Sequence, residues 1–313
     1  MDPFDAILEL GGEPLRAAMA AVEARLREIT AIEEYSLATV AAGGKRLRPL
    51  LVFVAGLGAD AHEALCRAAS AVELIHSATL VHDDVLDDAP LRRGSQSVFA
   101  AAGRRAATAT GDLLFSSAFA ELARNGAIAQ LRALSAASAA LARGELMQRA
   151  DAWRADVTVE RYLERCELKT ARLFAAACEL GALVGNGPPL APFGRAVGLA
   201  FQLLDDVLDV TGPAERTGKR RGTDLLDGTV TLPLILARES SPELLALDLR
   251  EITGASDAER VCMAIEATGA DERARRHALD LVATAKRDLP PACPPLQREA
   301  LELMADGLVE RFA

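Results

Sequence analysis

The sequence predicts an all-α protein. Apolar residues recur at helical spacing in nearly every segment, and no alternating apolar and polar run bounded by turn residues predicts a strand. Half of the 313 residues are hydrophobic and only 4% are aromatic, a balance that favours closely packed helices over a sandwich or a barrel. We therefore expect one helical domain over residues 1–313.

Glycine and proline residues separate most of the predicted helices. These breaks are short, and none is long enough to be a linker between domains. The predicted helices span residues 13–40, 48–57, 61–89, 95–124, 127–150, 158–184, 190–212, 229–238, 241–252, 257–268, 271–287 and 295–312.

The charge and the cysteines argue against several classes of function. A net charge of −10 disfavours non-specific nucleic-acid binding. The five cysteines are scattered without CxxC spacing, which favours buried thiols in a reducing compartment over a zinc site. The N-terminus lacks a secretory signal pattern, and no uncharged apolar run reaches about 18 residues. We therefore expect a soluble cytoplasmic protein without stable membrane insertion.

A cluster of four aspartates, at residues 83–88, ends a long apolar helical run. On a helix, Asp83 and Asp87 lie one turn apart on the same face, while Asp84 and Asp88 lie about 100° round the helix. Like charges at this spacing repel each other and are costly to bury. Magnesium removes that cost, because it binds a few carboxylates together with substrate phosphates.

A second acidic cluster, formed by Asp205, Asp206 and Asp209, ends another apolar run. Asp205 and Asp209 again share a helical face. Short basic loops accompany the two clusters, at residues 43–49, 91–94 and 217–224. Cations and Mg²⁺ together can hold the oxygens of a diphosphate. The sequence therefore predicts two aspartate faces that bind a magnesium diphosphate.

With these motifs the chain resembles the all-trans polyprenyl diphosphate synthases, which join isoprenyl units head to tail. The matching motifs are GGKRLRP at 43–49, HSATLVHDDVLDDAPLRRG at 76–94, GDLLFSSAF at 111–119, GE at 144–145, LKTARLF at 168–174, FQLLDDVLD at 201–209 and GKRRGTDLLDGTVTLP at 218–233. One DDxxD motif is weak evidence, whereas two of them, with RRG after the first and FQ before the second, are specific. The resemblance implies an antiparallel helical bundle around a central cavity (the isoprenoid synthase type I fold), usually as a homodimer.

The resemblance also implies roles for single residues. The Mg²⁺ ligands would be Asp83 and Asp87 with Asp84 close by, and Asp205 with Asp206 and Asp209 in support. The allylic diphosphate would contact Arg92, Lys169, Thr170, Gln202 and Lys219. Isopentenyl diphosphate would bind without metal to Lys45, Arg48, His76 and Arg93. The residues expected to act in catalysis are Asp83, Asp84, Asp87, Lys169, Thr170, Gln202 and Asp205.

The implied reaction needs no protein nucleophile. Metal and cations stabilise the departing diphosphate, so that the allylic C–O bond ionises to a carbocation and pyrophosphate. The double bond of isopentenyl diphosphate attacks the cation, and a proton is then lost, for which the departing diphosphate is a plausible acceptor. The dipoles of Thr170 and Gln202 are suited to shield the cation.

Two segments depart from the family pattern. A basic residue often follows the acidic-Gly pair before TLP, but Thr229 follows Asp227-Gly228 in this chain, and Arg220 or Arg221 could compensate. The segment after RRG, residues 95–103, is divergent.

Small residues below the first aspartate motif bear on product length. Ala78 and Thr79 lie where bulky side chains would block an elongation tunnel, and residues 134–140 of the helix expected to face them are also mostly small. Close helix packing is the alternative meaning of these residues. We expect a medium- to long-chain product of about twenty-five carbons or more, with the twenty-carbon geranylgeranyl product as the alternative.

Other functional classes fit less well. A class I terpene cyclase would carry an Asn/Asp-rich second motif with Ser/Thr and Glu, and a head-to-head synthase would lack RRG and GGKRLRP. A non-catalytic subunit of a heteromeric prenyl synthase would generally lose an aspartate motif, and this chain keeps both.

Overall fold

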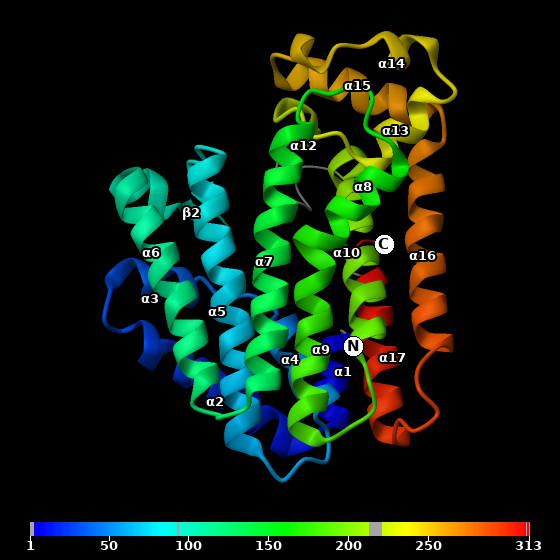
Figure 1. Cartoon of the computed structure of the whole chain (residues 1–313). Coiled ribbons are helices and arrows are strands. Elements are labelled where there is room, and N and C mark those ends of the chain that lie inside the picture. The colour runs from blue at the N-terminus through cyan, green and yellow to red at the C-terminus, as the bar shows by residue number, and fades with distance from the viewer. Residues whose placement is uncertain (1–2, 93, 213–220, 311, 313) are drawn as a thin grey trace. The chain divides into compact units, whose positions relative to one another are not determined.

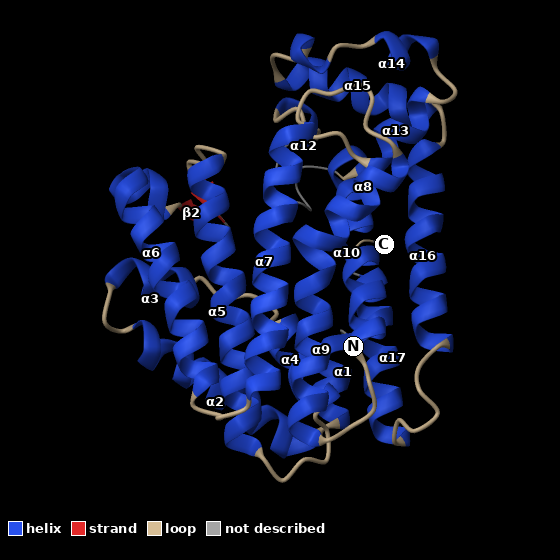
Figure 2. Cartoon of the chain, in the orientation of Figure 1, coloured by secondary structure: helices blue, strands red, loops and turns tan. Residues whose placement is uncertain are grey.

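The computed structural model describes residues 3–92, 94–212, 221–310 and 312 (Figure 1). Throughout these residues the chain forms helices, apart from loops and one two-stranded antiparallel hairpin (Figure 2). The predicted all-α class is confirmed.

The chain forms two compact units built from alternating segments. Unit 1 contains Met1–Ala139, Leu173–Gly194 and Asp288–Gly307, and unit 2 contains Ala140–Arg172, Arg195–Arg287 and Leu308–Ala313. The chain passes from one unit to the other several times, so no single linker separates them. The expected single domain stays a prediction.

Unit 1 holds the N-terminal helices and the hairpin. Its elements are α1 (Pro3–Leu10), α2 (Gly12–Thr30), α3 (Glu34–Ala41), α4 (Leu47–Ala55), α5 (His62–Leu86), β1 (Leu91–Arg92), β2 (Ser95–Gln96) and α6 (Val98–Ala123). It also contains the first part of α7 (Ile128–Asp151), most of α9 (Arg172–Gly185), the start of α10 (Ala191–Thr211) and most of α17 (Pro295–Glu310).

Unit 2 holds the rest of α7, α10 and α17 together with shorter elements. These are α8 (Val159–Cys166), the π-helical turn η1 (Glu167–Ala171), α12 (Thr223–Leu226), α13 (Leu232–Arg238), α14 (Pro242–Ala246), the 3₁₀ turn η2 (Leu249–Glu251), α15 (Ala255–Ala267) and α16 (Ala270–Arg287).

Several predicted boundaries were wrong. The helix predicted at 13–40 breaks after Thr30, because the Glu33 side chain accepts the backbone N–H groups of Tyr35 (2.9 Å) and Ser36 (2.6 Å) and so starts α3. No glycine or proline marks that break. The helix predicted to begin at residue 95 begins at Val98 instead. The sequence did not predict α1 or α12. The single helices predicted at 158–184 and 241–252 each correspond to more than one element in the structure.

The long helix α5 forms the centre of unit 1 and packs against α2, α4 and α6. It is long and apolar enough to cross a membrane by those two criteria, but 72% of its most apolar window is buried inside the protein. A core helix of a soluble protein has the same composition, so α5 by itself is weak evidence for a membrane span. Glycine allows close packing nearby: a Cβ on Gly181 of α9 would lie 2.2 Å from the Val52 carbonyl oxygen.

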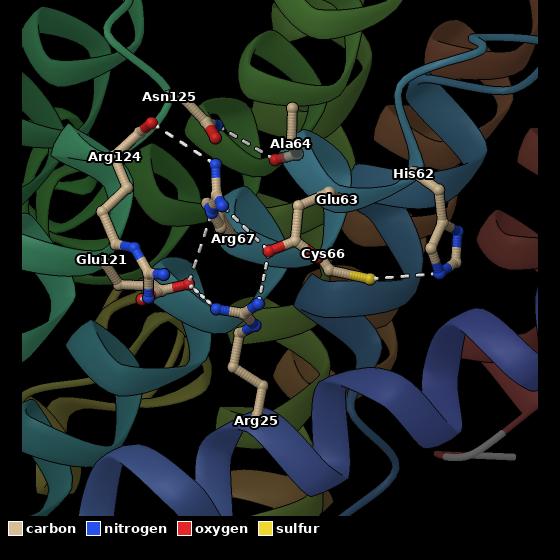
Figure 3. A network of polar contacts seen from close by, with 9 residues as sticks. All are labelled: Arg25, His62, Glu63, Ala64, Cys66, Arg67, Glu121, Arg124 and Asn125. Atoms are coloured by element: carbon tan, nitrogen blue, oxygen red, sulfur yellow. Dashed lines mark hydrogen bonds and ion pairs between the residues drawn. The ribbon is translucent and has the colours of Figure 1, made fainter.

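An ionic network joins α2, α5 and α6 within unit 1 (Figure 3). Glu121, which is buried, accepts hydrogen bonds from Arg25 (2.7 Å) and Arg124 (3.2 Å). Glu63 pairs with the same Arg25 and with Arg67 (2.9 Å). Because Glu121 is buried, loss of Arg25 would leave a buried carboxylate with fewer cationic partners, and the network thus links the three helices.

Candidate active site

The first aspartate cluster lies at the C-terminal end of α5. Asp83 is within the helix and is half-buried, and Asp87 is the exposed C-cap residue, whose N–H donates to the Asp83 carbonyl (2.8 Å). The two aspartates are therefore one helical turn apart, as the motif spacing predicts. Asp88 has left-handed backbone torsions (φ 48°) and lies outside the helix. The expectation that Asp88 continues the helix was wrong.

Asp84 is buried and binds Arg92. Its Oδ1 atom accepts hydrogen bonds from both Nε (2.8 Å) and Nη2 (2.5 Å) of the Arg92 guanidinium. Both bonds are charge-assisted, so they fix the plane of the guanidinium and leave its Nη1 group to point elsewhere. Asp84 thus orients a residue that we expect to contact the allylic diphosphate.

The hairpin after α5 fixes the backbone of Arg92. Arg92 pairs with Ser95 across the two strands, and Gly94 in the connecting turn has φ 78°. Ser97 closes the hairpin, because its hydroxyl donates to the Ala89 carbonyl (2.5 Å) and accepts the N–H of Ala100 in the first turn of α6 (3.0 Å). The divergent segment therefore has a defined role in supporting Arg92. Arg93, a predicted isopentenyl diphosphate contact, lies outside the described residues.

His82, the residue before the cluster, packs against α6. A Cβ on Gly111 would lie 2.2 Å from His82 Nε2, so only glycine allows this approach. The same nitrogen lies 3.3 Å from the Asp112 carboxylate, and the imidazole stacks on Phe115. The sequence interpretation missed His82, although the GDLLF motif reflects this packing.

The three cations of the GGKRLRP loop separate into one structural arginine, Arg46, and two predicted substrate contacts, Lys45 and Arg48. Arg46 is buried with left-handed torsions (φ 48°), and it pairs with Glu23 (2.5 Å) and Glu73 (2.7 Å) while donating to the Val40 carbonyl (2.7 Å). Arg46 therefore anchors the loop to α2, α3 and α5. The sequence interpretation did not identify this structural arginine.

The predicted isopentenyl diphosphate contacts that the structure describes all belong to unit 1. Lys45 is exposed, with its ammonium 4.7 Å from the centre of the Phe4 ring. Arg48 is half-buried in the first turn of α4, with its guanidinium 4.4 Å from the centre of the Phe174 ring. His76 is half-buried on α5.

Lys169 and Thr170 lie in the π-helical turn of unit 2. Such turns are rare and occur often at functional sites. Gly144 of α7 approaches this turn closely, since a Cβ there would lie 2.5 Å from the Lys169 backbone nitrogen. The neighbouring Glu145 pairs with Lys169 Nζ (2.5 Å). Burial raises the pKa of Glu145, but the charge and hydrogen bond of Lys169 outweigh it, so the pKa is lowered overall. The GE motif therefore positions Lys169.

The second aspartate cluster lies near the C-terminal end of α10. Asp205 is exposed, whereas Asp206 is buried. The carboxylate of Asp206 accepts hydrogen bonds from the Tyr162 hydroxyl and the Gln202 amide, both at 2.7 Å. The Gln202 amide oxygen in turn accepts the Thr170 hydroxyl (2.7 Å). Burial raises the pKa of Asp206 to about 7.

Asp209 binds the start of α12. Its two carboxylate oxygens accept the backbone N–H groups of Thr223 (3.2 Å) and Asp224 (3.1 Å), and its carbonyl accepts the N–H of Gly222 (2.9 Å). A carboxylate at this position caps a helical turn. Lys219, the predicted diphosphate contact, lies outside the described residues, and Arg220 does so as well.

Arg221, one of the two residues expected to replace a missing cation, is held by α15. Its guanidinium pairs with Glu259 (2.8 Å) and Glu266 and donates to the Val210 carbonyl. These contacts favour a structural role over a contact to substrate. Thr229 itself donates its N–H to the Asp224 carbonyl (2.8 Å), which closes the turn that contains Asp227-Gly228.

The structure places the residues expected to limit product length within α5 and α7. The side chain of Ala78 is fully buried, and that of Thr79 is half-buried, with its hydroxyl on the His76 carbonyl (2.7 Å). On α7, Leu134 and Ala137 are buried as well. Full burial of the Ala78 methyl favours close packing at that level, while Thr79 keeps partial exposure.

Comparisons with known proteins agree with these motifs. A family model described as polyprenyl synthetase matches residues 29–267, a range that includes both aspartate clusters. The short chain isoprenyl diphosphate synthase of Methanothermobacter thermautotrophicus is 38% identical over 286 residues, covering 87% of this chain and 88% of that protein. Component 2 of the heptaprenyl diphosphate synthase of Geobacillus stearothermophilus is 43% identical over 230 residues, covering 70% of this chain and 72% of that protein.

Solved structures extend the similarity to nearly the whole chain. A crystal structure of a polyprenyl synthase from Caulobacter crescentus CB15, complexed with calcium and isoprenyl diphosphate, superposes with a TM-score of 0.90 at 35% identity. The superposition covers 99% of this chain and 98% of that one.

Proposed function

The chain belongs to the polyprenyl synthetase family, and we propose that it is a magnesium-dependent trans-polyprenyl diphosphate synthase. It elongates an allylic diphosphate with isopentenyl diphosphate and releases pyrophosphate. The observation that carries this proposal is the pair of aspartate clusters inside the matched region, each at the C-terminal end of a long helix and each followed by a basic segment.

The carboxylates fit a magnesium ion that shares its coordination with substrate. Among the residues that the structure describes, no three His, Cys, Asp or Glu side chains converge closely enough to hold a metal ion by themselves. Magnesium commonly uses one or two carboxylates with substrate phosphates and water. Asp83 and Asp87, one turn apart, would supply the first pair, and the exposed Asp205 would supply the main ligand of the second cluster. When bound, the metal would neutralise charge on the departing diphosphate.

Other residues of the chain would place the reactants. Asp84 orients the Arg92 guanidinium and Glu145 orients the Lys169 ammonium, so both cations are held before the allylic diphosphate arrives. Thr170 and Gln202 would present oxygen dipoles to the allylic carbocation after the C–O bond breaks. The double bond of isopentenyl diphosphate, held by Lys45, Arg48 and His76, then attacks that cation. The reaction depends on placement and electrostatics.

We propose a medium- to long-chain product of about twenty-five carbons or more. The similarity to a component of a heptaprenyl diphosphate synthase supports a long product, and the small, half-buried side chain of Thr79 is consistent with it. The similarity to a short chain isoprenyl diphosphate synthase supports the twenty-carbon alternative. Because the heptaprenyl relative is component 2 of its synthase, a heteromeric assembly is tested as well.

The test is elongation by the purified chain. The protein is incubated with farnesyl and isopentenyl diphosphates, with Mg²⁺ or with excess EDTA, and the dephosphorylated products are sized by chromatography. We expect polyprenols that grow with time in Mg²⁺ and none in EDTA. Pyrophosphate release without elongation would point to a cyclase, and turnover only after addition of a partner protein would point to a heteromeric enzyme.

We further propose that the enzyme is a cytoplasmic homodimer. The five cysteines are buried and free, in keeping with a reducing compartment. The homodimer is supported by the resemblance to the polyprenyl diphosphate synthases, which implies a homodimer. Light scattering after size-exclusion chromatography should give twice the 33.0 kDa chain mass.

A further inference from the structure

Tyr162 is a buried residue of α8 that none of the motifs discussed above contains. Its side chain is fully buried, and its hydroxyl donates to Asp206 Oδ2 (2.7 Å). Burial, followed by the neighbouring Asp206 carboxylate, raises the pKa of Tyr162 well above its ordinary value. In this contact the phenol hydroxyl is the donor and the carboxylate oxygen accepts.

Four side chains in unit 2 form one hydrogen-bonded chain that begins at Tyr162. Asp206 accepts the Tyr162 hydroxyl on one oxygen and the Gln202 amide nitrogen on the other, and Gln202 accepts the Thr170 hydroxyl on its amide oxygen. All three contacts are 2.7 Å long. The four residues come from α8, the π-helical turn and α10. This hydrogen-bonded chain therefore connects the buried Tyr162 with Gln202 and Thr170, two residues of the proposed allylic site.

The order of donors and acceptors determines the orientation of the last two groups. Because the Gln202 amide nitrogen faces Asp206, its oxygen faces Thr170. The Thr170 proton then points to Gln202, and the lone pairs of that hydroxyl point away from it. Rotation of the Asp206 carboxylate or inversion of the Gln202 amide would break this order. Each oxygen of Asp206 accepts one hydrogen bond, Oδ1 from the Gln202 amide and Oδ2 from the Tyr162 hydroxyl. The Tyr162 hydroxyl therefore restrains the second oxygen of this carboxylate.

We propose that Tyr162 is a positioning residue for prenyl transfer, which acts through Asp206 to fix the Gln202 amide and the Thr170 hydroxyl toward the allylic cation. This inference rests on the proposed function. Removal of the phenol oxygen would leave isopentenyl diphosphate binding intact, since the residues proposed for that substrate are not members of the hydrogen-bonded chain. It would slow the ionisation step, because the dipoles would lose their fixed direction.

A double-mutant cycle tests whether Tyr162 affects kcat through the hydrogen-bonded chain that ends at Thr170. Tyr162→Phe and Thr170→Val each keep the shape of the side chain and remove one hydroxyl, and their oxygens share no direct contact. We expect each variant to lower kcat by about tenfold while the KM for isopentenyl diphosphate changes by less than about twofold. The kcat of the double variant should lie within about twofold of the kcat of the slower single variant. Two independent effects would instead multiply and lower kcat by about one hundredfold. Multiplying effects, or a kcat of Tyr162→Phe within twofold of the wild type, would overturn the proposal.

Fluorine NMR tests the same hydrogen-bonded chain in the absence of catalytic turnover. The protein has two tyrosines, Tyr35 and Tyr162, so a Tyr35→Phe variant that carries 3-fluorotyrosine gives one signal, from position 162. We expect Thr170→Val to shift that signal, and Thr268→Val to leave it in place. Thr268 is a matched control because its hydroxyl also donates within unit 2, to the Ile265 carbonyl (2.6 Å).

An unmoved signal in Thr170→Val would overturn the proposal even if Tyr162→Phe did not fold. If the wild-type protein failed to elongate any allylic diphosphate, the proposed function would fail instead. The fluorine signal would then decide on the hydrogen-bonded chain by itself.

Discussion

Asp84 holds Arg92 through two hydrogen bonds to a single carboxylate oxygen, at 2.8 Å from Nε and 2.5 Å from Nη2. Asp84, a member of the first aspartate cluster, thus has a partner of opposite charge, and both residues belong to unit 1. The cluster is therefore divided between a pair that faces one side of α5, Asp83 and Asp87, and a buried member that orients a cation.

The Asp84–Arg92 contact predicts a selective loss of allylic diphosphate affinity. In Asp84→Asn the guanidinium loses its charged acceptor, and hydrogen bonds of this kind contribute about 1.5–3 kcal/mol. We expect the KM for the allylic diphosphate to rise about tenfold or more and the KM for isopentenyl diphosphate to change little. Asp88→Asn is the matched control, since its partner Arg104 is exposed and that pair contributes little. Equal effects of the two substitutions on steady-state kinetics would contradict this role.

Adjacent cations of the GGKRLRP loop should give opposite phenotypes. Arg46→Met leaves the buried Glu73 without its partner, so we expect a loss of about 3–5 kcal/mol in the free energy of unfolding, measured with urea. Lys45→Met removes an exposed cation, so the free energy of unfolding should stay within about 0.5 kcal/mol of the wild-type value while the KM for isopentenyl diphosphate rises. A stable Arg46→Met protein would contradict the anchoring role.

Asp209 should control the order of α12. In Asp209→Ala the N–H groups of Thr223 and Asp224 lose their acceptor, so their hydrogen exchange should accelerate by about tenfold or more. Asp205→Ala is the control: it should abolish Mg²⁺-dependent elongation and leave those two amides protected. Unchanged exchange in Asp209→Ala would show that the carboxylate does not hold this helix.

The thiols should be inert in the native protein. Burial raises the pKa of Cys166 and Cys178 to about 12 and that of Cys66 to about 11. At pH 8 these groups are almost entirely thiols, and the thiolate fraction rises about tenfold per pH unit until the pKa is reached. We expect no reaction with a disulfide reagent at pH 8 within minutes, and five reactive thiols after denaturation. Rapid labelling of native protein at pH 8 would contradict this burial.

Ala78 provides a test of the tunnel expected below the first motif. Replacement of Ala78 by Phe should shorten the product, because the larger ring would fill the path of the growing chain. Because the methyl is fully buried, we expect overpacking to cost about 1–3 kcal/mol, so the melting temperature is measured together with the product sizes. An unchanged product distribution in a folded variant would contradict the tunnel and favour close packing at this position.

The sequence alone determined the fold class and most of the helices, because amphipathic spacing and glycine or proline breaks act locally. It failed where a long-range or side-chain contact decides the backbone. The break before α3 depends on the capping carboxylate of Glu33, and the hairpin after α5 depends on strand pairing and Ser97. Neither feature has a periodic signature in the sequence.

The motif spacing likewise determined which aspartates share a face, because helical geometry is the same in every protein. Only the tertiary structure distinguished the roles of neighbouring charges. Arg46 anchors its loop on the buried Glu73 and the half-buried Glu23, while Lys45 is exposed. Asp206 accepts a hydrogen bond from Tyr162, while Asp205 is exposed. Burial and the nearest partner decide whether a charge is structural or available, and both depend on segments that are distant in the sequence.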